Sequence, residues 1–173
     1  MQVGMALWGV ALLLCAAVLG ALLQKSRAAG RLVYAVCLLA SLEILVLGSW
    51  HLLAGSASGV RLPVGLAWSG AHFRVDALAA FFLVVVNLGG AGASLFAIGY
   101  GQHEVAPGRV LPFYPLFLAG MNLVVLADDA FSFLAAWEFM SLSSWALVVA
   151  HHRDSDNTSA GRIPLPARIS VNV

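Results

Sequence analysis

Apolar runs alternate with short polar segments along the whole chain. About 20 consecutive apolar residues are needed to cross the hydrocarbon layer of a membrane. The sequence offers five such runs, at residues 1–23, 32–54, 77–100, 110–127 and 130–150, separated by segments rich in Gly, Pro and charged residues. The pattern therefore predicts an all-α fold, a polytopic membrane bundle of about five transmembrane helices. The segment 55–76 is predicted to be a polar, glycine-rich connection.

Composition supports a membrane environment and argues against other classes. Hydrophobic residues make up 61% of the chain and charged residues only 10%, whereas soluble domains average about 25% charged residues. Lipid must therefore cover part of the surface. The net charge of +1 argues against a nucleic-acid partner. Cys15 and Cys37 both lie inside apolar runs, which disfavours a disulfide framework or a zinc site.

The first apolar run is predicted to be a retained helix rather than a signal peptide. A signal peptide places its basic residues before a shorter apolar core, but here Lys25, Arg27 and Arg31 follow the run. Because basic loops stay in the cytoplasm, the amino terminus is expected outside the cell membrane and the first loop inside.

Glu138 is the main candidate for chemistry. It lies near the middle of the fifth apolar run, where an ionised carboxylate is costly and is retained for a partner or a task. Ser141 follows by three residues and could hydrogen-bond it, and Trp137 precedes it directly. No basic residue lies within reach on the same helix, so a cationic partner must come from another helix. The alternative is a protonated glutamate that only bonds a neighbouring helix.

Glu43 is a second acid inside an apolar run. Its neighbours at helical spacing, Leu39 and Leu47, are apolar. A second proton-relay carboxylate is as compatible with this pattern as a residue that only forms an interhelical hydrogen bond or faces a lumen.

Other polar residues inside the runs point to packing. Asn87 and Asn122 are expected to join helices, as amides do in lipid. Gly90 and Ser94 have the small-xxx-small spacing of closely packed helices. Asp76 immediately precedes the third run and is expected to cap that helix.

Polar residues crowd the end of the fifth run. His151 and His152 are followed closely by Asp154 and Asp156. Adjacent histidines point to different helix faces, so this segment is interpreted as an interfacial loop rather than a metal site.

Three segments resemble one known family. FSFLAAWEFMSLSSWALVVAH, at residues 131–151, resembles the antiporter-like membrane subunits of complex I and related hydrogenases, and its WE-x-MSL-x-S core is the specific part. FRVDALAAFF, at residues 73–82, resembles the opening of the third helix in that family. HHRDSDNTSAG, at residues 151–161, resembles the cytoplasmic loop after the fifth helix. The likeness is strongest to component B of hydrogenase-4 and the corresponding formate hydrogenlyase subunit.

The resemblance implies a proton-translocating subunit of a respiratory or hydrogenase complex in the inner membrane. In that family the glutamate matching Glu138 pairs with a lysine on the seventh helix, and charge coupling between them drives proton transfer. Apart from the resemblance, Glu43 is a candidate second proton-relay carboxylate, and Ser141 and Trp137 are candidates for supporting the helix face of Glu138. Other membrane and peripheral subunits would be the partners. Redox chemistry would belong to those subunits, so no cofactor or metal is expected in this non-catalytic chain.

The chain also departs from the family pattern. Family members have more than a dozen helices, and a sixth would begin after residue 161, where this sequence continues as RIPLPARISVNV. Residues 1–161 are therefore expected to be an amino-terminal bundle of such a subunit, and residues 162–173 a divergent, unstructured tail.

Two other functions fit the same residues. One is a small non-catalytic scaffold or assembly protein that packs through its glycine-rich third helix. The other is a metal or solute transporter that uses Glu43, Glu138 and the histidine pair His151 and His152.

Overall fold

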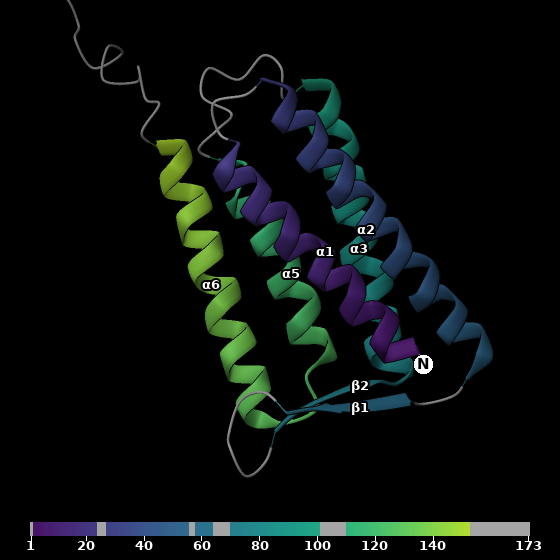
Figure 1. Ribbon diagram of the computed structural model, residues 1–173. Coiled ribbons are helices and arrows are strands. Elements are labelled where there is room, and N and C mark those ends of the chain that lie inside the picture. The colour runs from purple at the N-terminus through teal and green to yellow at the C-terminus, as the bar shows by residue number, and fades with distance from the viewer. Residues whose placement is uncertain (1, 24–26, 56–57, 64–69, 101–109, 153–173) are drawn as a thin grey trace, which may run out of the picture.

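The fold is a bundle of membrane helices closed at one end by a β-hairpin (Figure 1). The computed structural model describes residues 2–23, 27–55, 58–63, 70–100 and 110–152. Its elements are α1 (Gln2–Leu22), α2 (Arg27–Ala54), β1 (Ser58–Leu62), β2 (Ala71–Val75), α3 (Ala77–Tyr100), α5 (Phe113–Leu126) and α6 (Ala130–His152). The predicted all-α polytopic bundle is confirmed.

Four of the helices, α1, α2, α3 and α6, are long and apolar enough to cross a membrane. The fourth apolar run of the sequence forms the shorter helix α5, with 14 residues, which span about 21 Å at 1.5 Å per residue. The helix starts late because Pro112, at its N-cap, and Pro115 have no N–H to donate. It ends at Ala127, where the backbone becomes extended (ψ 128°) and runs toward β2.

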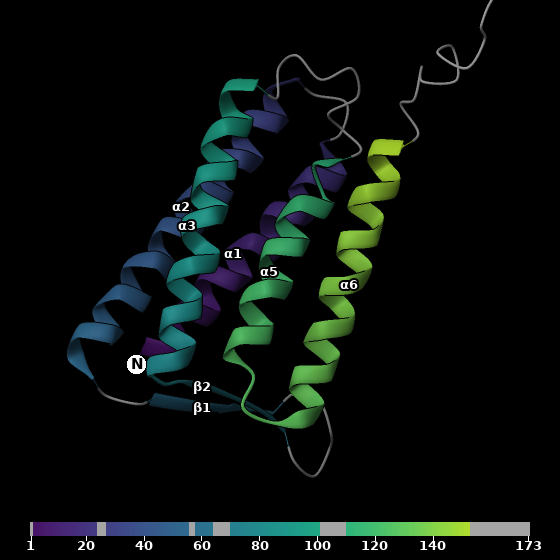
Figure 2. The ribbon, with the colours of Figure 1, turned by 180° about the vertical axis from the view of Figure 1, so that it is seen from behind.

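The helices are arranged so that α2 and α3 stand on one side of the bundle and α6 on the other (Figures 1 and 2). Between them, α1 packs on α2 and α5, and α5 packs on α1, α3 and α6. The hairpin lies across the ends of α3, α5 and α6. Glycines and small polar side chains, rather than large apolar ones, mark the closest approaches between these helices.

A pair of buried amides joins α3 to α5. Asn87 donates its side-chain N–H to Asn122 Oδ1 at 2.7 Å, and both side chains are fully buried. Each amide also donates to a carbonyl oxygen one turn earlier in its own helix. The prediction that these residues join two helices is confirmed.

The small residues of α3 lie in the same interface. Tyr114 Oη donates to the Gly90 carbonyl at 3.1 Å and lies 2.8 Å from Ser94 Oγ. A Cβ atom added at Gly90 would come within 3.0 Å of the Leu118 side chain. The predicted close packing through Gly90 and Ser94 is therefore confirmed.

Helices α5 and α6 approach each other closely at Gly120. A Cβ atom placed there would lie 2.9 Å from the Cα atom of Met140. Because carbon atoms in contact normally stay about 3.5–4.0 Å apart, only glycine allows the two backbones to come this close.

The segment expected to be only a polar connection contains the antiparallel hairpin β1–β2, with Ser58 paired to Val75 and Leu62 to Ala71. Side chains alternate between the faces of a strand, and on β2 the buried positions Ala71 and Val75 alternate with the more exposed His72 and Arg74. Phe73 also pairs with Ala127 at the end of α5.

Candidate functional site

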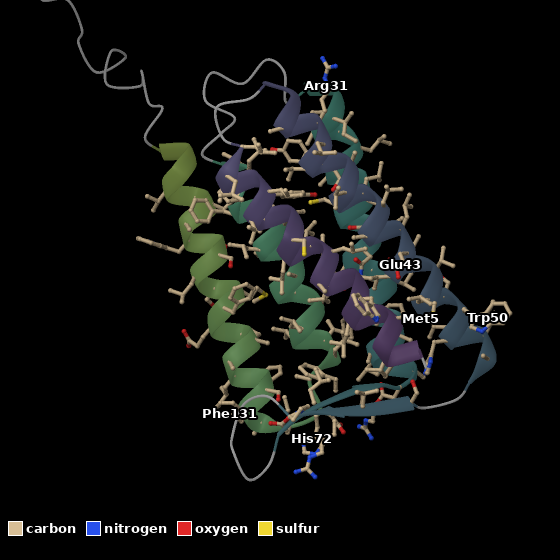
Figure 3. The ribbon with its side chains drawn as sticks, viewed as in Figure 1. Met5, Arg31, Glu43, Trp50, His72 and Phe131 are labelled. Atoms are coloured by element: carbon tan, nitrogen blue, oxygen red, sulfur yellow. The ribbon has the colours of Figure 1, made fainter. Side chains whose placement is uncertain are left out.

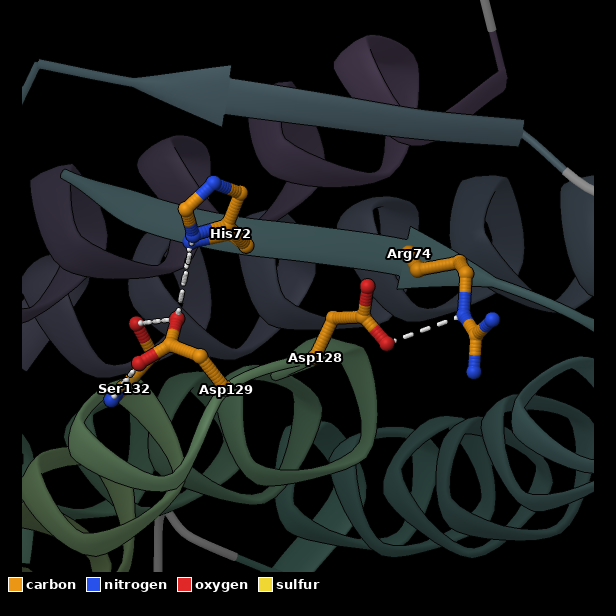
Figure 4. A network of polar contacts seen from close by, with 5 residues as sticks. All are labelled: His72, Arg74, Asp128, Asp129 and Ser132. Atoms are coloured by element: carbon orange, nitrogen blue, oxygen red, sulfur yellow. Dashed lines mark hydrogen bonds and ion pairs between the residues drawn. The ribbon is translucent and has the colours of Figure 1, made fainter. Parts of the chain in front are cut away.

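The helix that carries Glu138 begins at a cluster of polar side chains, which we call the hairpin clasp (His72, Arg74, Asp128, Asp129 and Ser132; Figure 4). Asp129 caps α6, because its Oδ1 accepts the backbone N–H of Ser132 at 2.8 Å. Its Oδ2 accepts the Ser132 hydroxyl at 2.6 Å and the backbone N–H of His72 at 2.9 Å. One carboxylate thus joins the first turn of α6 to β2.

Hydrogen bonding makes Asp129 a stronger acid than usual. The Ser132 hydroxyl, the backbone N–H groups of Ser132 and His72, and the nearby His72 ring together lower the pKa of Asp129 to about 2. The His72 Nδ1 atom lies 3.8 Å from Asp129 Oδ2. Asp129 is therefore ionised at neutral pH, as a carboxylate that accepts several N–H and O–H groups should be.

The second part of the clasp is centred on Arg74. Its Nε atom lies 2.9 Å from Asp128 Oδ1, and Nη2 lies 3.5 Å from Asp76 Oδ2. The backbone N–H of Asp128 donates to the His72 carbonyl at 2.9 Å. Asp76 Oδ1 accepts the Ala79 N–H at 2.8 Å, which confirms the predicted cap of α3. Strand β2 thus connects the starts of α3 and α6.

Glu138 lies in the middle of α6 on the side that does not pack against the bundle. The packed side of this helix carries Ser132, Ala136 and Ser143, which are buried. Glu138 and Ser141 are both exposed. Among the residues that the structure describes, Glu138 has no hydrogen-bond or ion-pair partner. The acid is thus presented outward, near the middle of an apolar helix long enough to cross a membrane.

The two residues expected to support Glu138 share its outward exposure. No hydrogen bond joins Ser141 to Glu138 in this structure. Trp137 is exposed and contacts Phe133, with ring centroids 5.8 Å apart. The surface around Glu138 therefore combines one acid, one hydroxyl and aromatic side chains.

Glu43 is half-buried, about midway along α2 (Figure 3). Among the described residues, Glu43 too has no hydrogen-bond or ion-pair partner. Because α2 and α6 stand on opposite sides of the bundle, the structure does not bring Glu43 and Glu138 together. A transporter site built from both acids has no support in this arrangement.

The side chains of the expected interfacial loop, from His151 onward, lie outside the described part of the chain, as does the segment 162–173. Over the described ranges, no three His, Cys, Asp or Glu side chains gather as metal ligands would.

The hairpin clasp was not predicted from the sequence. Asp129 followed three residues later by Ser132 is a helix-start signal that could have indicated the cap. Nothing local could indicate the link from Asp129 to His72, because the two residues are 57 positions apart in the chain.

No protein-family model matches the chain. Curated proteins do. An uncharacterised protein of Mycobacterium tuberculosis is 37% identical over 114 residues, which cover 63% of this chain and 18% of that protein. Hydrogenase-4 component B of Escherichia coli is 31% identical over 112 residues, covering 64% of this chain and 16% of the relative.

A third relative comes from the respiratory enzymes. NADH-quinone oxidoreductase subunit L of Mycobacterium tuberculosis is 28% identical over 105 residues, covering 60% of this chain and 16% of that subunit. The matched part of this chain therefore spans less than a fifth of the length of each of these relatives. Over about 60% of its length this multi-pass membrane protein is similar to hydrogenase-4 component B and to NADH-quinone oxidoreductase subunit L.

Proposed function

We propose that this chain acts in a proton-translocating membrane subunit of a hydrogenase or NADH-quinone oxidoreductase type complex, with Glu138 as the coupling carboxylate. The names of the homologues support the type of complex. The outward position of Glu138 on α6 supports its role in this chain.

The cost of a carboxylate at this depth is the main physical reason. A charged side chain at the centre of a membrane helix costs about 2.5–3.5 kcal/mol on insertion scales. Inside the described part of the bundle nothing offsets that cost for Glu138, although buried positions on the same helix are available to smaller residues such as Ser143. A carboxylate held outward is therefore placed to meet a cation on a helix that packs against this side of α6.

Such a pair can carry a proton in two steps. While Glu138 is ionised and close, it stabilises the protonated form of an amine partner. When the pair separates or Glu138 takes up a proton, that stabilisation is lost and the amine releases its proton. The resemblance to the antiporter-like family implies a lysine as this partner.

Glu43 is a second proposed proton-relay carboxylate, separate from the first. Its half-buried position on α2 and its lack of a partner among the described residues are compatible with protonation and deprotonation there. The proposed setting is the inner membrane, with the amino terminus outside, and other subunits of the complex as partners.

The test is proton uptake into inverted membrane vesicles of the host. Vesicles would be energised with hydrogen or with NADH, and acidification would be followed by quenching of an acridine dye. Glu138→Gln keeps the shape and hydrogen bonding of the side chain but cannot ionise. We expect it to abolish the chain-dependent part of the signal, whereas Glu138→Asp, which still ionises, should retain part of it.

Controls make the result specific. The chain-dependent part is defined by deleting the gene, and immunoblots verify that both variants insert to the same level. Leu142→Ala replaces another exposed side chain of α6 and should leave proton uptake nearly unchanged. Normal proton uptake by the Glu138→Gln variant would refute the proposal.

A further inference from the structure

Helix α6 is attached to the rest of the bundle on one side only. It packs along α5 and touches β2, and no other described element makes an extended contact with it. Figures 1 and 2 show the helix at the edge of the bundle from both directions. The direction in which Glu138 points therefore depends on these two attachments alone.

The attachment to α5 includes a close contact between backbones. A Cβ atom at Gly120 would lie 2.9 Å from Met140 Cα, so the two helices approach closely at this point. Small residues let the backbones of membrane helices come this close. This contact sets the separation of α5 and α6.

The attachment to β2 is directional. Asp129 accepts three hydrogen bonds, two from Ser132 of α6 and one from the backbone of His72 in β2. Rotation of α6 would have to break at least one of them. Asp129 precedes Glu138 by nine residues, or about 13.5 Å along the helix axis, so the clasp and the acid belong to one rigid rod.

We infer that Asp129 is a positioning residue for Glu138: by linking the start of α6 to β2, it fixes the rotation and depth of the helix and so the direction in which Glu138 faces. The functional part of this inference rests on the proposed role of Glu138. The structural part stands on the clasp alone.

An asparagine at this position separates the clasp from ordinary helix capping. Asparagine caps a helix about as well as aspartate, because its carbonyl oxygen can accept the Ser132 N–H. Its NH₂ group would then face the His72 N–H, where a second acceptor is needed. Asp129→Asn therefore keeps the cap and loses the direct hydrogen bond from the His72 N–H to the side chain at position 129.

Asp76 provides a matched control. It caps α3 through the Ala79 N–H just as Asp129 caps α6. However, α3 also packs extensively on α2 and on α5. Asp76 also lies 3.5 Å from Arg74 of the clasp, but no described hydrogen bond or ion pair joins it to α6. Loss of this cap should therefore leave α6 in place, so Asp76→Ala controls for a general weakening of the chain.

The position of α6 can be measured by electron paramagnetic resonance on the full chain in lipid nanodiscs. Spin labels would be attached at Leu142→Cys on α6 and Val46→Cys on α2, both 63% exposed and therefore tolerant of a label. Cys15 and Cys37 would first be replaced by Ser and Ala, respectively. The parent should give one narrow distance distribution.

We expect Asp129→Ala and Asp129→Asn to broaden and shift that distribution, and Asp76→Ala to leave it unchanged. A parent-like distribution for Asp129→Ala would overturn the inference. So would broadening by Asp129→Ala without broadening by Asp129→Asn, since that result assigns Asp129 to capping alone. If Asp129→Ala does not fold, Asp129→Asn carries the test, because it keeps the cap and removes the bond to His72; a parent-like distribution for Asp129→Asn would then overturn the inference.

Proton uptake in vesicles then separates the two proposals. If Asp129→Asn inserts normally but lowers proton uptake severalfold, Asp129 positions a functional Glu138. A different result refutes the positioning role: Glu138→Gln abolishes uptake, but Asp129→Asn leaves uptake unchanged although it changes the distances. If Glu138→Gln leaves uptake unchanged while the distances still depend on Asp129, the proposed function fails and the structural role of the clasp survives.

Discussion

Replacing Gly120 by alanine should force α5 and α6 apart. The added Cβ would lie 2.9 Å from Met140 Cα, 3.0 Å from Met140 Cβ and 3.2 Å from Met140 N. Two of these three atoms belong to the backbone, so no side-chain rotation relieves the clash. The helices must separate by roughly half an ångström or more to restore an ordinary carbon–carbon contact of about 3.5–4.0 Å.

The expected cost follows from two opposing effects. Overpacking a tight contact costs about 1–3 kcal/mol, while alanine gains up to about 1 kcal/mol over glycine in helix propensity. The clash should outweigh the propensity, because α5 is the main packing partner of α6. We therefore expect Gly120→Ala to lower the free energy of unfolding by about 1–2 kcal/mol.

Gly89 offers a matched control in the neighbouring helix α3. A Cβ atom there meets nothing within 4 Å, so Gly89→Ala should be neutral or stabilise the chain slightly. Both variants can be compared by unfolding in mixed micelles of dodecyl maltoside with increasing dodecyl sulfate, followed by tryptophan fluorescence. Equal stability of the Gly120→Ala and Gly89→Ala variants would refute the close approach of α5 and α6.

Three further predictions concern the polar contacts. Asn87→Leu should destabilise the chain by about 1–2 kcal/mol, because it leaves the buried Asn122 amide without its partner. The double variant with Asn122→Leu should recover part of this loss, and strict additivity of the two single-variant losses would contradict the pairing. Arg74→Ala should lower the free energy of unfolding by less than about 1 kcal/mol, and by less still in high salt, because the side chains of Arg74 and Asp128 are 52% and 36% exposed. A large loss of stability that does not depend on salt would contradict this prediction. The pKa of Asp129 is lowered from 3.8 to about 2, so the ionised Asp129 stabilises the fold above pH 3.8, and this stabilisation is lost as the pH falls through 2. The free energy of unfolding measured against pH should show this loss for the parent chain and not for Asp129→Asn.

The helices themselves could be predicted from the sequence because a membrane helix needs a long apolar run and little else. The run at residues 77–100 became helix α3 without a change of boundary, since Asp76 caps its start. The run at 110–127 contains the shorter helix α5, because its prolines delay the start. Length and charge decide whether a run can span, whereas prolines and the chain beyond the run decide where the helix begins and ends.

The hairpin could not be predicted from the same signals. Its strands have five residues each, too few for an alternating pattern to stand out from a glycine-rich segment. The strands are also stabilised from outside, by pairing of Phe73 with Ala127 and by the bond from His72 to Asp129. Contacts between residues so distant in sequence leave no local pattern.

The direction of Glu138 was the least predictable feature, because hydrophobicity does not mark the inside of a membrane bundle. Lipid is as apolar as leucine, so large apolar side chains can face outward while small and polar residues hold helices together. On α6 the serines at 132 and 143 are buried, and Leu142 and Trp145 are exposed. By this rule a polar residue in the middle of α6 should face inward, but Glu138 does not. An acid on the outward side of a membrane helix is costly wherever lipid covers it. Under the proposed function, a cation on a further helix against this side of α6 would offset that cost.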